Sequence, residues 1–227
     1  MPEQLTFNLP SQPALGRGDF FVSPGNAAAV DTIQTWHDWP QGKLVLVGPK
    51  AAGKTHLAHV WAALTGARII AAGDLADAAI DTLATGPVAV EDADAIAGSA
   101  AAEQALFHLH NQVLAQGQPL LITAATPPAR WGLGLPDLAS RMQGSAMVTL
   151  AAPDDALLSA VLVKLFADRQ VAIEPLVITY LVSHMERTFA GAGRLVQALD
   201  QAALAERRRI SRALAGEVLD KLGQDGP

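Results

Sequence analysis

Eight consecutive residues combine glycine, lysine and hydroxyl groups in a pattern that binds phosphate. They match the sequence G-x-x-x-x-G-K-[ST], and they are Gly48, Pro49, Lys50, Ala51, Ala52, Gly53, Lys54 and Thr55. Glycines let successive backbone N–H groups converge on one anion, and the amino terminus of a following helix adds a partial positive charge. We expect Lys54 to reach the β- and γ-phosphate oxygens of a nucleotide, and the Thr55 hydroxyl to hold Mg²⁺.

The segments on either side of this loop support that chemistry. The apolar run 43–47 predicts a buried strand, and the run 54–64 predicts a helix. A phosphate-binding loop requires this strand-to-helix context. We therefore predict a site for ATP or ADP with Mg²⁺, and we extend the binding set by one residue to His56. The alternative is a glycine-rich turn that only joins a strand to a helix.

A second group of residues suits the metal of such a site. The apolar residues 88–90 predict a strand, which ends in the acids Glu91 and Asp92. Phosphoryl transfer requires an acid that positions the metal at the end of a neighbouring strand. We expect Glu91 and Asp92 to hold Mg²⁺ and to order the attacking water. The alternative is an acidic loop that caps a helix.

Short apolar segments alternate with helical ones through most of the chain, which predicts an α/β protein with a parallel sheet covered on both faces. Predicted strands cover 44–47, 68–71, 88–90, 120–124 and 147–150, and predicted helices between them cover 54–64, 74–83 and 100–116. From residue 154 only helices are predicted, over 154–169, 175–186, 191–208 and 211–222, with Asp154 as the first N-cap. We predict an extended tail over 1–18, a nucleotide-binding α/β domain over 19–152 and a small all-helical domain over 153–227.

Composition excludes several classes of function. The chain has 227 residues and no cysteine, so disulfides, thiol nucleophiles and cysteine-bound zinc are absent. A net charge of −6 argues against a protein that wraps nucleic acid. No secretory signal and no apolar run long enough to span a bilayer is evident, so we expect a cytoplasmic protein without membrane contact. His56, His59, His108 and His110 lack further ligands at suitable spacing, and we interpret them as packing or surface residues rather than metal ligands.

The order of several segments resembles the bacterial replication initiator DnaA and its relatives in the AAA+ nucleotide-binding class. The segments are Gly53-Lys54-Thr55-His56-Leu57, the acidic pair, Leu120-Leu121-Ile122-Thr123, Pro127-Pro128, Ser140-Arg141 and the all-helical tail. The resemblance covers residues 19–222 and implies an AAA+ three-layer domain followed by a helical lid. It also implies ATP or ADP with Mg²⁺, and it leaves self-association through AAA+ interfaces open. The initiator continues into a DNA-binding domain beyond this region; we expect no direct sequence-specific DNA binding here.

The resemblance assigns roles to two arginines. Arg141 matches an arginine finger, which acts across a subunit interface on the nucleotide of a partner, here ATP bound to DnaA. Arg194 matches the lid arginine called sensor 2, which contacts the β-phosphate of the nucleotide held in cis. The alternatives are an exposed arginine on a short helix for Arg141 and an ion pair within the lid for Arg194.

The amino-terminal residues resemble a peptide that docks on the replicative sliding clamp. Leu5, Phe7 and Leu9 alternate and suit an apolar groove, while the Gln4 amide can form hydrogen bonds at one end. The alternative is a terminal strand packed on its own domain. A clamp motif joined to an AAA+ region is the layout of DnaA-homologous regulators, which stimulate hydrolysis of DnaA-bound ATP and so lower replication initiation.

Three departures from the family pattern predict little ATPase activity at this chain's own site. Glu91 stands where the initiator has an aspartate, Ala124 and Ala125 replace polar residues, and 136–138 lacks an additional arginine. We therefore expect a nucleotide-holding subunit rather than an efficient ATPase. Regulators with this layout work best with ADP bound, so the resemblance implies an ADP-bound activator of a partner. Two other functions stay open: an AAA+ ATPase that acts as a loader, and an adaptor that recruits DnaA-family proteins without stimulating hydrolysis.

Overall fold

The computed structural model describes residues 22–23 and 25–224. Its centre is a parallel sheet of five strands in the order β2-β3-β4-β1-β5. The strands are β1 (Lys43–Val47), β2 (Arg68–Ala71), β3 (Val88–Glu91), β4 (Leu120–Ala124) and β5 (Ala146–Thr149). Each strand range predicted from the sequence agrees to within one residue at either end. Because all strands are parallel, every loop that follows a strand emerges at the same edge of the sheet.

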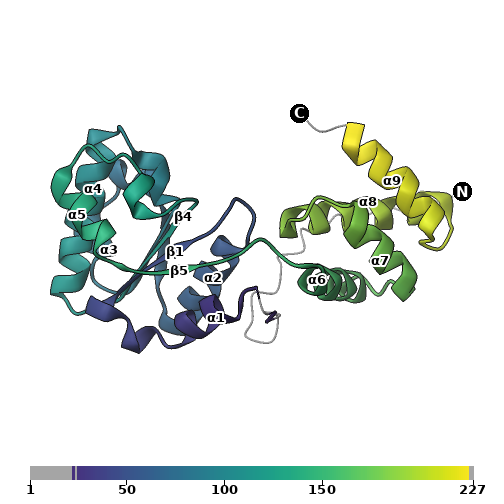
Figure 1. Ribbon diagram of the computed structural model, residues 1–227, viewed down its shortest axis with the longest axis horizontal. Helices are drawn as coiled ribbons and strands as arrows, with labels where there is room; N and C mark the ends of the chain where they lie inside the picture. The colour runs from purple at the N-terminus through teal and green to yellow at the C-terminus, as the bar shows by residue number, and fades with distance from the viewer. Residues whose placement is uncertain (1–21, 24, 225–227) are drawn as a thin grey trace, which may run out of the picture.

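Helices cover both faces of the sheet and make three layers (Figure 1). Helices α1 (Ala27–Gln34) and α2 (Lys54–Thr65) pack on one face, where Leu44 and Leu46 of β1 point. Helices α3 (Ile80–Leu83), α4 (Ala100–Ala115) and α5 (Pro136–Gln143) pack on the other, where Val45 and Val47 point. Successive side chains of a strand face opposite sides, so a strand covered on both faces must be apolar throughout.

The helix predicted over 74–83 is wrong in its continuity. A 3₁₀ segment, η3 (Ala72–Asp77), is followed by the single turn of α3, and the chain between them is extended at Ala78, with φ −85° and ψ 147°. The break lets Leu75 reach the core while Ile80 and Leu83 pack against it from the following turn. Alanine-rich sequence favours helix, but burial of these apolar residues decides the path.

Sequence patterns did not reveal the short elements. Helices α1 and α5 have eight residues each, too few for a strong periodic signal. The remaining 3₁₀ segments are η1 (Trp36–Asp38), η2 (Pro40–Gly42), η4 (Ala93–Ile96) and η5 (Pro128–Arg130).

The C-terminal part is helical and has a core of its own. It contains α6 (Asp155–Asp168), α7 (Pro175–His184), α8 (Phe189–Glu206) and α9 (Arg212–Gln224), which lie beside the α/β part in Figure 1. Leu162, Phe166 and Leu181 are fully buried among them. Asp154 caps α6 as predicted, because its Oδ1 accepts a hydrogen bond of 2.7 Å from the Leu157 N–H. Within the residues that the structure describes, no helix has the length and apolarity to cross a membrane.

Candidate functional site: a phosphate loop and an exposed arginine

The predicted phosphate loop leaves the carboxyl end of β1 and leads directly into α2. The Gly48 N–H donates to the Ala124 carbonyl at 3.1 Å, so pairing with β4 continues one residue beyond the strand. The chain then turns at Ala51 and Gly53, whose φ values are 62° and 101°. Helix α2 begins at Lys54, and its amino terminus therefore faces the loop, which is the arrangement that binds phosphate.

Packing requires both glycines of the motif, and at Gly53 the positive φ is a second reason. A Cβ at Gly48 would lie 2.5 Å from the Leu150 carbonyl oxygen, and a Cβ at Gly53 would lie 2.8 Å from Cε2 of Phe189. Leu150 follows β5 and Phe189 is the first residue of α8. The loop is thus enclosed on one side by the exit of the sheet and on another by the helical part.

Lys54 lies over the loop with its ammonium group turned inward. Its Nζ donates to the carbonyl oxygens of Gly48 at 2.9 Å and Pro49 at 3.2 Å, and its exposed fraction is 7 %. A cation held at this position can turn from the carbonyls to a phosphate bound in the loop. Thr55 is exposed at the start of α2, so its hydroxyl is accessible to a ligand. His56 is half-buried on the same turn.

The predicted metal acids lie at the same edge of the sheet as the loop. Glu91 ends β3, and β4 separates that strand from β1. The Oε1 atom of Glu91 is buried and has no hydrogen-bond partner among the described residues, which is unusual for a carboxylate oxygen. Asp92 has a φ of 55°, and its N–H donates to Thr123 Oγ1 at 3.2 Å. Carboxylate and hydroxyl oxygens suit Mg²⁺, so the residues present fit this metal.

Asp94 is a polar residue of this edge that was not among the predicted site residues. Its Oδ2 accepts hydrogen bonds from the N–H groups of Ala125 at 2.9 Å and Thr126 at 3.1 Å. It therefore ties the segment after β3 to the turn after β4. Of the two alanines after Thr123, Asp94 thus fixes the backbone of Ala125.

Arg141 lies at the opposite edge of the sheet. It is exposed in the last turn of α5, and its carbonyl oxygen accepts from Nζ of Lys43, the first residue of β1, at 3.2 Å. The two ends of β1 are about 13 Å apart at roughly 3.3 Å per residue. The phosphate loop follows the far end, and α5 lies on the side of the α/β part away from the helical part (Figure 1). The Arg141 guanidinium is therefore remote from this chain's own loop.

An aromatic ring and a hollow lie beside the Arg141 side chain. Its guanidinium carbon lies 5.2 Å from the centroid of the Phe107 ring on α4, a cation–π distance. A hollow of about 510 Å³ beside this ring is lined in part by His108 and Leu135. An exposed arginine next to an apolar hollow is typical of a protein–protein contact.

Glu103 anchors the start of the same helix, α5, and was not among the predicted site residues. Its buried carboxylate accepts from the N–H groups of Gly98 at 3.0 Å, Gly134 at 3.2 Å and Leu135 at 2.7 Å. Burial acts to raise the pKa of Glu103, but the three backbone donors outweigh it and lower that pKa. A lone glutamate on an apolar helix could have signalled such an anchor.

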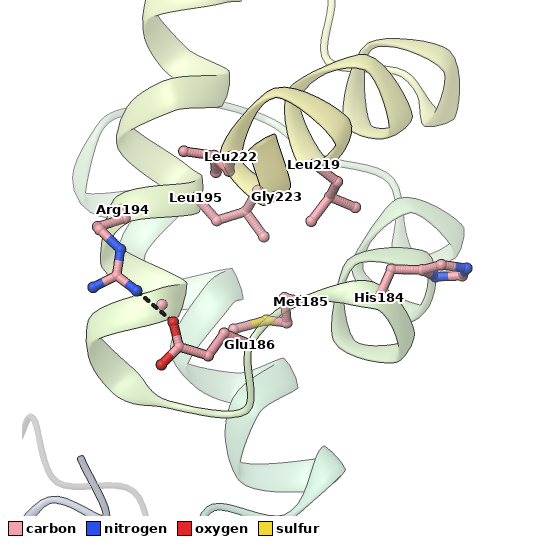
Figure 2. A pocket seen from close by; sticks show the side chains of 9 residues that line it. His184, Met185, Glu186, Arg194, Leu195, Leu219, Leu222 and Gly223 are labelled. Atoms are coloured by element: carbon pink, nitrogen blue, oxygen red, sulfur yellow. Dashed lines mark hydrogen bonds and ion pairs between the residues drawn. The ribbon is translucent and has the colours of Figure 1, made fainter. Parts of the chain in front are cut away.

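Arg194 faces Glu186 within the helical part (Figure 2), and the two form an ion pair. The Arg194 side chain is 59 % exposed, and it borders a small hollow of about 180 Å³ that Leu195 and Leu219 also line. The structure does not bring Arg194 into contact with the phosphate loop. A contact with a nucleotide in cis stays a prediction.

The clamp motif lies outside the described residues. Gln4, Leu5, Phe7 and Leu9 all belong to the first 21 residues, and their docking role stays a prediction.

Similar solved structures share this architecture, although no family model matches the chain. Domain III of the Thermotoga maritima replication initiation protein DnaA superposes with a TM-score of 0.80 at 17% identity, covering 94% of this chain and 98% of that one. AMPPCP-bound DnaA from Aquifex aeolicus gives a TM-score of 0.65 at 18% identity, with 85% and 65% covered. Thermotoga maritima RuvB gives 0.64 at 18% identity, with 86% and 66% covered.

These likenesses extend over the sheet and the helical part together. At such identities they concern the fold, and the roles of individual residues have to be argued from their geometry. The parallel five-stranded sheet with flanking helices and a following helical part is the AAA+ fold of DnaA and RuvB.

Proposed function

We propose that this protein is an AAA+ regulator of replication initiation with the layout of Hda, the DnaA-homologous regulator. It holds a nucleotide at its own phosphate loop, docks on the DNA-loaded sliding clamp through Gln4, Leu5, Phe7 and Leu9, and stimulates hydrolysis of ATP bound to DnaA. Arg141 supplies the stimulating charge. The consequence is fewer ATP-bound initiators and less initiation.

The position of Arg141 carries the proposal. The residue is exposed, it lies at the edge of the sheet opposite the phosphate loop, and it has an apolar hollow beside it. An arginine there has no access to this chain's nucleotide, but it can complete a site on another molecule. DnaA with the same fold presents its phosphate loop at the corresponding edge of its own sheet, which permits a head-to-tail contact.

The mechanism combines a charge contact with tethering. A guanidinium that enters a partner's site stabilises the negative charge that develops on the γ-phosphate oxygens during transfer. Docking on the clamp keeps both proteins near the same DNA and raises their effective concentration. The reaction at the γ-phosphate thus takes place in the nucleotide site of DnaA, and this chain contributes one oriented cation.

The nucleotide held in cis has a binding role in this proposal. The loop, Lys54, Thr55, Glu91 and Asp92 would hold ADP with Mg²⁺, which neutralises phosphate charge when bound. We propose ADP rather than ATP because the regulators whose layout this chain resembles work best with ADP bound. Glu91, one methylene longer than aspartate, displaces the carboxylate from the position that efficient transfer requires, so we expect little hydrolysis in cis. Arg194 would sense the nucleotide after release from Glu186.

The decisive experiment measures hydrolysis of DnaA-bound ATP in the presence of ADP and clamp loaded on DNA. The intact protein, Arg141→Ala and the triple variant Gln4→Ala/Leu5→Ala/Phe7→Ala are compared, with Arg209→Ala, an exposed arginine of the helical part, as a matched control. We expect stimulation by the intact protein and the control, and its loss in both other variants. No stimulation by the intact protein overturns the proposal.

The complete phosphate loop favours a second function, an AAA+ ATPase that acts as a loader. An inward-held Lys54 and the unpaired oxygen of Glu91 are compatible with turnover in cis. Basal ATPase activity that Lys54→Ala abolishes supports this function.

An adaptor is the remaining alternative. It is supported if DnaA binds normally and Arg141→Ala has no effect on the hydrolysis of DnaA-bound ATP.

A further inference from the structure

Two buried basic residues lie directly beneath the turn that carries Arg141. Lys43 is 4 % exposed and His110 is 2 % exposed. The Lys43 Nζ atom lies 3.3 Å from His110 Nε2 and 3.2 Å from the Arg141 carbonyl oxygen. Among the residues that the structure describes, no carboxylate forms an ion pair or hydrogen bond with Lys43. A lysine buried without an acid is costly, which suggests that its hydrogen bonds serve a purpose.

The hydrogen bonds around His110 indicate which ring nitrogen carries the proton and which accepts one. His110 Nδ1 lies 3.2 Å from Asn111 Oδ1, an atom that only accepts. The proton of a neutral imidazole therefore belongs on Nδ1, which leaves Nε2 free to accept from the Lys43 ammonium. Burial, and then the charges of Lys43 and Arg141, lower the pKa of His110 to about 4 despite the bond to Asn111. The imidazole is neutral at physiological pH, as this arrangement requires.

The Lys43 ammonium acts on the end of α5. The last four carbonyls of a helix have no partner within it, and the Arg141 carbonyl accepts only side-chain donors among the described bonds: Lys43 Nζ and, at 2.9 Å, Ser145 Oγ. A cation also interacts favourably with the carboxyl terminus of a helix. Helix α5 has only eight residues, and so short a helix depends on contacts of this kind.

The other end of Arg141 is held by the same neighbouring helix. Its guanidinium lies over Phe107, one turn before His110 on α4. The arginine is thus fixed at its backbone through Lys43 and His110 and at its tip by an aromatic ring. Such double support limits the orientations that an exposed, long side chain can adopt.

We propose that Lys43 and His110 are positioning residues for Arg141, which fix the backbone of its turn so that the guanidinium enters a partner's nucleotide site in one orientation. Neither residue touches the partner. The inference rests on the proposed function for its consequence in hydrolysis, and on the geometry of this chain for the orientation itself. Precise orientation matters because a displacement of about 1 Å can cost roughly 100-fold in rate.

The first test measures stimulated hydrolysis at saturating concentrations of the regulator. Lys43→Met keeps an unbranched side chain, one heavy atom shorter, and removes the donor. His110→Leu removes the acceptor, whereas His110→Gln retains one. We expect Lys43→Met and His110→Leu to lower the maximal rate about 10-fold, with affinity for ATP-bound DnaA unchanged. His110→Gln and the exposed-site control Lys221→Met are expected to retain the rate.

The same substitutions are repeated in an Arg141→Ala background. If Lys43 acts through Arg141, Lys43→Met has no further effect there, because coupled residues are not additive. An equal loss in both backgrounds, or a loss of DnaA affinity that accounts for the whole effect, overturns the inference. Thermal unfolding of each variant separates a positioning effect from a failure to fold.

A second test needs no partner. The order parameter of the Arg141 Nε–H group is measured by NMR relaxation in the intact protein and in Lys43→Met, with assignment by Arg141→Lys. We expect an ordered group that becomes mobile in Lys43→Met and stays ordered in Lys221→Met. A mobile group in the intact protein, or one that Lys43→Met leaves unchanged, overturns the inference. If the NMR result holds but the intact protein does not stimulate DnaA, the proposed function fails and the positioning role stands.

Discussion

The sheet has a cation at each edge: one lies turned inward where the strands end, and the other is exposed where they begin. At the carboxyl edge, Lys54 turns inward and donates to carbonyls of its own loop. At the amino edge, Arg141 is exposed and rests on an aromatic ring. In the proposed function, Lys54 meets a ligand that enters this molecule, and Arg141 reaches a site on a different molecule. The length of β1 keeps them apart, as the proposed function requires of a chain that holds one nucleotide and acts on another.

The largest expected effect is the loss of stimulated hydrolysis when Arg141 is replaced by lysine. Arg141→Lys keeps the charge but loses the planar, bidentate donor, so stimulated hydrolysis of DnaA-bound ATP should fall by about 10³-fold. Binding of ADP to this chain, measured by titration calorimetry, should not change. Full stimulation by the lysine variant would show that charge alone suffices at this edge.

Lys54→Ala addresses the opposite edge. Loss of the ammonium should weaken ADP binding by about 100-fold, since it removes a charge-assisted contact to phosphate. Equilibrium binding of a fluorescent ADP analogue measures this loss. The Arg141 Nε–H order parameter should remain that of the intact protein; a change there would mean that the two edges are coupled.

His110, at the amino edge, should make the free energy of unfolding depend on pH. The pKa of His110 is about 4 in the folded chain and ordinarily 6.5. Between these values the unfolded chain binds the proton and the folded chain does not, so the free energy of unfolding falls as the pH falls. At pH 4.5 this group should remove about 2 kcal/mol relative to pH 7.

Urea unfolding at pH 7 and 4.5 measures that loss, and His110→Gln provides the reference because the amide does not titrate. The difference between the two proteins isolates His110 from the other groups that titrate in this range. Equal losses in both proteins would place the imidazole in a more solvated position than the structure shows.

The smallest expected effect concerns the loop that encloses the nucleotide site. Gly53→Ala introduces a Cβ at φ 101° and 2.8 Å from the Phe189 ring, whereas Gly66→Ala introduces one at φ 73° with no atom within 4 Å. Backbone strain alone should cost Gly66→Ala about 1 kcal/mol, and the additional clash should cost Gly53→Ala about 2 kcal/mol. The free energy of unfolding in urea measures both, and equal costs would show that Phe189 yields without penalty.

Much of the α/β architecture followed from local sequence. Each of the five strands is a short apolar run bounded by glycine, proline or charge, and their burial on both faces leaves little choice of pattern. The loop from Gly48 to Thr55 could be predicted because its glycines allow the turns that the loop makes. The helices of the C-terminal part were predicted to within a few residues for the same reason: their apolar periodicity extends over several turns.

Short helices and long-range anchors escaped prediction. Helix α5 and the 3₁₀ segments are too brief to show a period, and η3 broke a segment whose composition favours helix. Glu103 and Asp94 act by accepting backbone N–H groups from chain more than thirty positions away. No local pattern encodes such a partner.

The sequence by itself determined the class of fold and the phosphate loop, because both depend on the order of side chains along a few residues. Only the tertiary structure decided that Arg141 stands at the edge opposite that loop, and that Lys43 and His110 lie buried beneath it. Those relations depend on which ends of strands meet and on which helices pack together. They become visible only when residues distant in the chain, such as Lys43 and Arg141, are brought within hydrogen-bonding distance.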